Sequence, residues 1–428
     1  MKTFGRKACF KRLIPTWLLF LCAPALVQTA PGRDSDWPEF RGPTGQGIAD
    51  EADPPLHWSP TQNIAWKRFI PGEGWSSPIL YQGSLYLTTA LTNEQDHPVS
   101  LRLIRVDAAT GEVIWDREIF GRTGPSPRQD KNSHASATPI ARDGHIYAHF
   151  GHMGTACVDL AGDLVWTQTE LDHAPVHGNG GSPILVDDKL IFSCDGTENP
   201  FVVGLDKATG AVAWKTARHK TEAWGISFST PLLVEEGGEK VVVSPGSGHV
   251  AAYNPVDGGE IWRVLYGKGY SVVPRPVYSQ GHVFIGTGFM SASVLAVRLG
   301  GRGDVTDSHL TWKTKSYAPK TPSMLCHGKE LYYVADNGHM TCVDALTGKE
   351  HWQQRLGGTF SASPVLAGGR LYVVSEKGVT SVIAAGTTYT LLARNDLAEK
   401  SFASPAVSGK AIFIRTEHHL HRIEAQGG

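Results

Sequence analysis

The sequence predicts an all-β protein, an eight-bladed β-propeller built from four-stranded blades. Three observations predict this fold. A unit of four short β-type runs recurs along most of the chain, the turn Asp-x-x-Thr-Gly is followed by Trp at a fixed spacing, and each chain end holds part of one unit. Repeats of about 40–50 residues with four strands are typical of propeller blades.

The repeating unit is clearest between Pro322 and Trp352. Three runs of strand-forming residues are separated by turns that contain glycine, and a fourth run follows the turn from Asp344 to Gly348. The Asp side chain accepts hydrogen bonds from backbone amides two or three residues later, and Gly supplies the positive φ. The closing Trp is expected to fill the wedge between neighbouring blades.

Each unit opens with a proline before an apolar run, and the eight openings are spaced 41 to 61 residues apart. The openings are Ser77-Pro78, Thr138-Pro139, Ser182-Pro183, Thr230-Pro231, Arg275-Pro276, Thr321-Pro322, Ser363-Pro364 and Ser404-Pro405. The seventh unit has Leu391-Leu-Ala-Arg394 where the others have Trp, so its outer wedge is expected to pack weakly.

The chain ends distinguish a closed ring from a solenoid, the competing architecture, which needs capping repeats at both ends. The last unit supplies three strands, and residues 63–70 read as one isolated strand that would complete it. This pairing would close the ring and remove the exposed sheet edges. The predicted propeller therefore spans residues 63–424.

Two segments precede the propeller. Residues 1–25 combine basic residues such as Lys2 and Arg12 with an apolar run too short to span a bilayer, which is typical of a signal peptide. The bulky Leu21 before Cys22 argues against a lipid anchor. Residues 26–62 form an arm rich in Pro and Gly, whose Trp37 and Trp58 are expected to pack on the propeller. The protein is thus expected to be exported, periplasmic or secreted.

The composition limits the classes of binding partner that are expected. A formal net charge of −1 gives no excess that would favour nucleic acid or an anionic membrane surface, and a monomer that does not span the membrane is expected. After signal cleavage four cysteines remain, without a Cys-x-x-Cys pair. Their positions in the repeating unit indicate that they are packing residues, and their disulfide state stays open. They are Cys157, Cys194, Cys326 and Cys342.

The candidate site lies in the segments that precede the innermost strands, since these segments converge on one mouth of the central channel. Aromatic rings, imidazoles and amides at a concave mouth are suited to a flat or anionic ligand. The alternative is that they cap strand ends and bind loop backbone. The candidate ligand-binding residues are Trp75, Asn132, His134, His177, Asn179 and Trp224, with Arg275 at the same mouth.

The repeated Pro opening and the Asp-x-x-Thr-Gly-x-x-x-Trp turn resemble the pyrroloquinoline quinone (PQQ)-like repeat propellers of the quinoprotein alcohol dehydrogenase-like superfamily, over residues 63–424. In size and blade number the chain is similar to BamB-like exported propellers, which bind protein partners without a cofactor. The vicinal Cys-Cys pair of the methanol-type PQQ enzymes is absent from this sequence. Asp195, Glu198 and Asn199 offer oxygen ligands for Ca²⁺, although Asp-Gly-Thr-Glu-Asn-Pro is also an ordinary turn composition.

We therefore expect an exported non-catalytic propeller that binds an envelope protein or a small ligand at the channel mouth. No cofactor and no catalytic residue are expected. The alternative function is a PQQ-dependent dehydrogenase with a reduced active site, in which PQQ binds with Ca²⁺. The alternative requires a positive channel pocket with a carboxylate–amide cation site.

Overall fold

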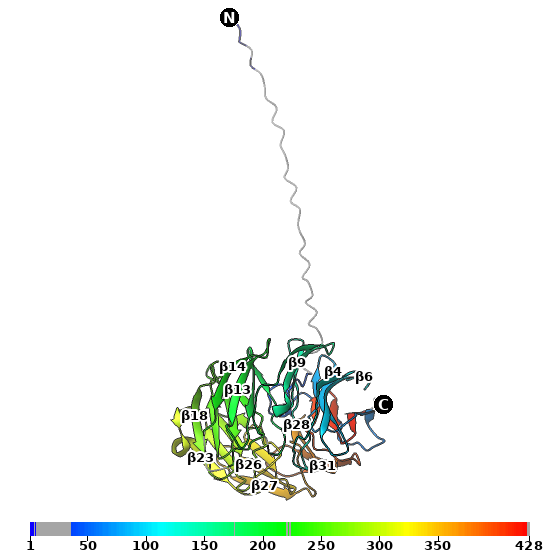
Figure 1. The fold of residues 1–428 in the computed structure, drawn as a ribbon, viewed down its shortest axis with the longest axis vertical. Helices are drawn as coiled ribbons and strands as arrows, with labels where there is room; N and C mark the ends of the chain where they lie inside the picture. Colours follow the sequence, from blue (N-terminus) through cyan, green and yellow to red (C-terminus); the bar gives the residue numbers. More distant parts are fainter. Residues whose placement is uncertain (4, 6–35, 175, 220, 222–223, 426–428) are drawn as a thin grey trace.

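A computed structural model describes residues 1–3, 5, 36–174, 176–219, 221 and 224–425. Within these residues the chain forms eight sheets arranged as blades around a ring, with one short helix, α1 (Thr306–His309), and one 3-10 turn, η1 (Gly151–Met153). The chain runs around the ring in sequence order, and its red C-terminal strands lie beside the first, cyan blade (Figure 1). The predicted eight-bladed propeller is confirmed.

Each blade runs from an innermost to an outermost strand. The strands of blades one to four are β3 (Ile79–Tyr81), β4 (Ser84–Thr92), β5 (Pro98–Asp107), β6 (Val113–Gly121); β7 (Ile140–Arg142), β8 (His145–His149), β9 (Thr155–Asp159), β10 (Leu164–Gln168); β11 (Ile184–Val186), β12 (Lys189–Cys194), β13 (Phe201–Asp206), β14 (Val212–Ala217); and β15 (Leu232–Glu236), β16 (Glu239–Gly246), β17 (His249–Tyr253), β18 (Glu260–Leu265).

The strands of blades five to eight are β19 (Val277–Ser279), β20 (His282–Gly286), β21 (Val294–Arg298), β23 (Leu310–Thr314); β24 (Leu325–His327), β25 (Glu330–Val334), β26 (His339–Asp344), β27 (Glu350–Arg355); β28 (Val365–Ala367), β29 (Arg370–Val374), β30 (Val379–Ala384), β31 (Leu391–Asp396); and β32 (Ala406–Ser408), β33 (Ala411–Arg415), β34 (His419–Glu424), β2 (Ile64–Phe69). Because β2 pairs antiparallel with β34, the N-terminal strand completes the last blade as predicted.

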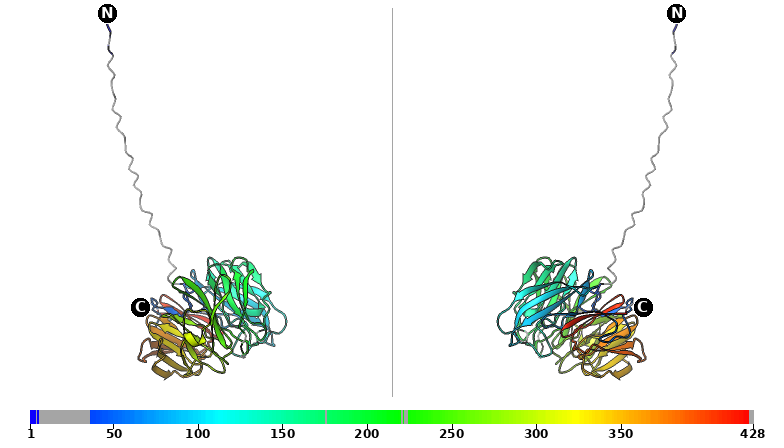
Figure 2. Two further views of the ribbon diagram at one scale, coloured as in Figure 1. Left: turned by 90° about the vertical axis from the view of Figure 1, so that its left-hand side faces the viewer. Right: turned by 90° about the vertical axis from the view of Figure 1, so that its right-hand side faces the viewer.

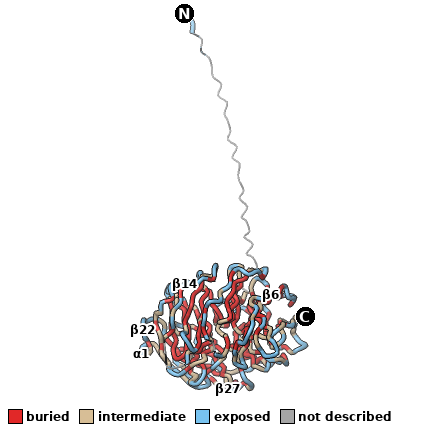
Figure 3. Tube along the Cα trace, in the orientation of Figure 1, coloured by how far each residue is buried: buried red, intermediate tan, exposed pale blue. Residues whose placement is uncertain are grey.

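Two further strands extend blades at their edges. β1 (Ile48–Ala49) of the arm pairs parallel with the innermost strand of blade seven, and β22 (Gly303–Asp304) pairs parallel with the outermost strand of blade four. Figure 2 shows the ring from two opposite sides, and buried residues concentrate along the strands (Figure 3). We call the face where the innermost strands begin the loop face, and the opposite face the arm face.

A ring of hydroxyl groups joins the innermost strands. Two residues before seven of the eight innermost strands, a backbone amide donates to a Ser or Thr hydroxyl at the same position of the next blade, at 2.9–3.1 Å. The ring positions are Ser77, Thr138, Ser182, Thr230, Arg275, Ser323, Ser363 and Ser404. The sequence-based opening of blade six was wrong by two residues, since Ser323 holds the ring position and Thr321 instead bonds Asp336.

The arm covers the end of the axis opposite the loop face. Its backbone bonds residues of the innermost strands of blades one, two and seven, namely Leu80, Ala141 and Leu366. Arg275, the one ring position without a hydroxyl, points toward this arm: its guanidinium donates to the Phe40 carbonyl and forms an ion pair of 2.9 Å with the buried Glu39. The prediction that Arg275 lines the loop-face mouth is therefore wrong.

The repeated Trp residues connect neighbouring blades at the arm face. Trp66 Nε1 donates to the Ala108 carbonyl of blade one at 3.1 Å, just after Asp107 in the Asp-x-x-Thr-Gly turn. Gly111 of that turn has φ +73°, and a Cβ there would lie 2.6 Å from the Trp66 ring. Five more Trp residues donate in the same way to the next blade: Trp115, Trp166, Trp214, Trp312 and Trp352.

Blade seven, which lacks this Trp, obtains one from the arm. Trp58 is 3% exposed and stacks on Tyr372 at a centroid distance of 6.2 Å. The same separation joins Tyr332 and Trp352 within blade six. Asn395 of blade seven fixes the arm here, because its side chain accepts from Trp58 N and donates to Leu56 O, each at 3.0 Å. The expected weak packing of this wedge is therefore wrong.

Replacing Trp58 with Ala tests the role of the arm. We expect Trp58→Ala to lower the free energy of unfolding by about 3–5 kcal/mol, since it empties a buried aromatic site. Urea unfolding followed by circular dichroism measures this loss. The control is Trp224→Ala, because Trp224 is 61% exposed. Equal free energies of unfolding for the two variants would contradict the packing role of Trp58 in blade seven.

Candidate functional site

Several buried polar atoms without hydrogen-bond partners lie on the loop face of blades one to four, while others, such as Trp37 Nε1 and Trp58 Nε1, lie in the arm. Among the described residues those on the loop face include Trp75 Nε1, His149 Nε2, Asn179 Nδ2, Asp195 Oδ2 and His249 Nε2. An unsatisfied buried polar atom is costly in a stable fold, and a cluster of such atoms indicates a site for water or a ligand. The loop face of blades one to four is therefore the candidate functional site.

The predicted residues form one connected group and one outlier. Asn132 donates from Nδ2 to the carbonyls of His177 and Asn179, at 2.7 and 3.2 Å. Its Oδ1 accepts from Ser133 N and Ser136 Oγ. Asn132 thus joins the entry segments of blades two and three by binding loop backbone, which is the alternative role that the sequence analysis left open.

His134 and Trp75 lie beside this group. His134 is 4% exposed, its Nε2 lies 3.1 Å from the Asp96 carbonyl, and burial lowers its pKa. Trp75 bonds Ser133 through its backbone amide and packs against Phe402 at 4.6 Å between ring centroids. The His134 side chain thus contacts a loop of blade one, and the Trp75 ring packs on the segment that precedes blade eight.

The long link between blades one and two lies over the loop face. Arg128 forms ion pairs with Glu73 at 3.1 Å and with Asp96 at 2.8 Å. Lys131 reaches Glu376 of blade seven at 2.9 Å. These ion pairs hold the link against blades one and seven, so the link has a fixed position on the loop face.

Asn179 connects the predicted group to a buried ion pair that the sequence did not reveal. Asn179 and Asp195 line the same small cavity of about 10 Å³, close to the volume of one water molecule. Asp195 Oδ1 lies 2.6 Å from Arg218 Nε, and both side chains are 1% exposed. Burial raises the pKa of Asp195 to about 6, and Arg218 opposes this rise.

Arg218 is held by more than Asp195. Its Nη2 donates to Ser193 Oγ and Ser244 Oγ, each at 2.7 Å, so the guanidinium spans blades three and four. The ion pair also bears on the expected Ca²⁺ ligands, because Asp195 is buried beside the positive charge of Arg218, which would repel a cation, while Glu198 and Asn199 are exposed. In the part of the chain that the structure describes, no three His, Cys, Asp or Glu side chains form a metal-binding group. These residues do not fit a Ca²⁺ centre for PQQ.

A larger cavity of about 380 Å³ opens on the loop face next to this ion pair. Its lining residues come from blades three and four: Asp195, Thr197, Glu198, Asn199, Pro200, Arg218, His219, Thr221, Gly225, Ser247 and His249. We call it the blade 3–4 cavity. Sequence reasoning singled out the turn from Asp195 to Pro200 but had no signal for Arg218 or His249.

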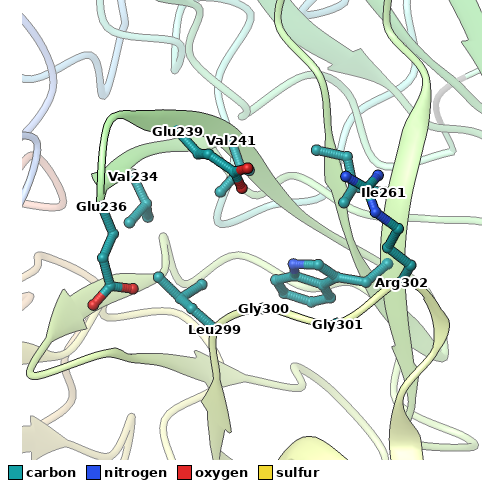
Figure 4. Close-up of a pocket in the computed structure, with 10 residues that line it drawn as sticks. Val234, Glu236, Glu239, Val241, Ile261, Leu299, Gly300, Gly301 and Arg302 are labelled. Carbon is teal, nitrogen blue, oxygen red and sulfur yellow. The ribbon is translucent and has the colours of Figure 1, made fainter.

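Another cavity, of about 400 Å³, lies at the outer rim of blades four and five on the arm face (Figure 4). Glu236 and Glu239 lie on one side of it and Arg302 on the other. It occurs where the blade-five insertion replaces the usual turn beside Trp262. Its charged side chains are exposed, so it lacks the buried unpartnered groups found on the loop face.

Trp224, the outlier of the predicted group, belongs to an exposed aromatic ridge. Trp224 packs on Tyr270, and Tyr270 on Phe289, with centroid distances of 5.7 Å for both pairs. Trp224 is 61%, Phe289 45% and Met290 67% exposed. No sequence pattern indicated Phe289 or Met290 as site residues. Exposed apolar surface of this kind marks interaction sites.

The four cysteines that the sequence singled out are buried and free of disulfides. Burial raises the pKa of the Cys157 and Cys342 thiols to about 12. They are therefore packing residues in their blades and not reactive groups of the site.

Comparisons with known proteins agree with this architecture. The family model described as outer membrane protein assembly factor BamB matches residues 58–216, 102–338 and 301–428. A BamB from Shewanella oneidensis is 24% identical over 390 residues, covering 83% of this chain and 90% of that protein. Quinohemoprotein alcohol dehydrogenase ADH IIB of Pseudomonas putida is 25% identical over 149 residues, covering 33% of this chain and 19% of the enzyme.

Solved structures show the same fold. BamB from Moraxella catarrhalis aligns with a TM-score of 0.60 at 12% identity, over 85% of this chain and 98% of that one. A europium-containing methanol dehydrogenase aligns with a TM-score of 0.66 at 11% identity, over 89% of both chains. At these identities the likeness concerns the fold alone.

Buried histidines next to the site make stability depend on pH. Burial lowers the pKa of His149 to about 3 and that of His152 to about 4, and the neighbouring His173 contributes to both shifts. In the unfolded chain the two imidazoles take up protons near pH 6.5. Their contribution to the free energy of unfolding is therefore fully present above pH 6.5 and is lost as the pH falls below it. Each histidine contributes a slope of up to about 1.4 kcal/mol per pH unit.

We expect His149→Phe to reduce this slope between pH 6.5 and 4. Chemical denaturation at a series of pH values measures it. The control is Phe192→Leu, which alters the ring packed 4.3 Å from His149 without removing a titrating group. An unchanged slope in His149→Phe would show that His149 does not carry the effect.

Proposed function

The chain belongs to the family described as outer membrane protein assembly factor BamB, and we propose that it is an exported, non-catalytic propeller that binds a protein partner of the cell envelope through its aromatic ridge. The relatives suggest an outer-membrane assembly-factor-like propeller that binds protein partners. The observation that supports this position of the binding surface is the exposed aromatic ridge, formed by Trp224, Tyr270, Phe289 and Met290.

The ridge has the composition of a binding hot spot. Aromatic and Met side chains are enriched at protein interfaces and contribute most of the binding free energy when a partner covers them. Lys320 Nζ lies 5.0 Å from the centre of the Phe289 ring, which adds a positive charge at the rim. The ridge spans loops of neighbouring blades, so it is one continuous surface on a rigid ring.

Export rests on the expected signal peptide, residues 1–25, most of which lies outside the described residues. Among the residues that are described, no helix is long and apolar enough to cross a membrane. The names of the BamB relatives support outer-membrane protein assembly as the setting of the partner, and this assignment is part of the proposal.

Site-specific photocrosslinking in cells tests the proposed surface. A crosslinking residue at position 289 is expected to capture a specific envelope protein, and Trp224→Ser with Met290→Ser in the same chain is expected to reduce that capture at least about tenfold, or about 1.4 kcal/mol. The matched control is position 256, where Val256 is 74% exposed on the arm face.

Equal capture from positions 289 and 256 would contradict the proposed surface. The dehydrogenase alternative has its own measurement, a titration of the purified mature protein with PQQ in the presence and absence of Ca²⁺. Saturable, Ca²⁺-dependent quenching of tryptophan fluorescence together with reduction of a dye by an alcohol or sugar would overturn the non-catalytic assignment.

A further inference from the structure

We propose that the blade 3–4 cavity is a binding site for a neutral carbohydrate, and that it takes a terminal pyranose of an envelope glycan. The proposal concerns a small-molecule site and is independent of the protein partner. With a volume of about 380 Å³, the cavity falls within the common range of ligand pockets, about 300–1,000 Å³.

Two buried acceptors without partners line the cavity. His249 is 1% exposed, and its Nδ1 lies 3.0 Å from the Ser247 carbonyl, so Nδ1 carries the proton and Nε2 is an acceptor. Among the described residues neither His249 Nε2 nor Asp195 Oδ2 has a hydrogen-bond partner. A ligand with hydroxyl donors would satisfy both atoms, each of which costs about 1–3 kcal/mol while unpaired.

The rim adds planar polar groups. Glu198 and Asn199 are exposed on the turn that follows Asp195, where they can bond further hydroxyl groups. A pyranose presents several hydroxyl donors at its edge, which match the acceptors that line the cavity.

Charge selects against acidic ligands. The Arg218 guanidinium is occupied by Asp195, Ser193 and Ser244, so it is not free to bind an anion. Because Asp195 and Arg218 neutralise each other, the exposed Glu198 leaves negative charge at the cavity, which would repel a carboxylate or phosphate. A neutral sugar is therefore the ligand class that fits.

Saturation-transfer NMR and calorimetry on the purified mature chain test the proposal. The probes are the methyl glycosides of glucose, galactose, mannose and N-acetylglucosamine, with glucuronic acid as the acidic comparison. We expect saturable, millimolar or tighter binding of at least one neutral probe and weaker binding of glucuronic acid.

Two variants assign the binding to this cavity. His249→Phe removes the buried acceptor, and Asn199→Ala removes an exposed rim amide without affecting the core; each is expected to weaken binding at least about tenfold, or about 1.4 kcal/mol. Met290→Ala on the neighbouring ridge is the control and is expected to bind as the wild type. If His249→Phe does not fold, Asn199→Ala alone decides.

Three outcomes would overturn the proposal: no neutral probe binds the wild type, glucuronic acid binds more tightly than every neutral probe, or Asn199→Ala binds as the wild type. None of these outcomes affects crosslinking from position 289. The failure of the carbohydrate site is thereby distinguishable from the failure of the proposed protein interface.

Discussion

In this protein the backbone amide at the entry of each innermost strand needs a partner, because the residue that carries it is buried. Seven of these amides are satisfied by a Ser or Thr hydroxyl of the next blade. The bond from Ser404 to Ser77 joins the last blade to the first. The hydroxyl ring therefore fixes the relative positions of the blades at the base of the loop face, where the candidate site lies.

The ring lacks a hydroxyl at Arg275, and the arm completes the structure there. Glu39 neutralises the guanidinium, and burial raises the pKa of this carboxyl while Arg275 opposes the rise. A Cβ on Gly45 would lie 2.4 Å from the Arg275 guanidinium, so this glycine permits the close approach of the arm. Together with Trp58 in the wedge of blade seven, these contacts make the arm part of the folded body, which leaves the opposite face for binding.

The sequence predicted the fold well because blade geometry follows from local patterns. The four-strand unit recurs around the ring with the same turn in several blades, and ring closure followed from incomplete units at the two chain ends. What the sequence could not predict was contact between distant segments. Nothing local pairs Trp58 with Tyr372, turns Arg275 toward Glu39, or brings Arg218 to Asp195.

The same distinction applies to the candidate site. The entry segments were correctly placed at one face, because each precedes an innermost strand. Their individual roles depend on partners in other blades: Asn132 binds the backbone of blade three, while Trp224 joins an exposed ridge with Tyr270 and Phe289. His249 gave no sequence signal, since its importance arises from burial without a partner for Nε2.

The most direct test of the central claim is hydrogen exchange at the ring amides. If the hydroxyl ring holds a rigid platform beneath the loop face, the amides of Ser77, Thr138, Ser182, Arg275, Ser323, Ser363 and Ser404 exchange at the slow rates of the core strands. Exchange of these amides as fast as that of an exposed loop amide such as that of Glu94 would contradict the claim that the ring fixes the blades.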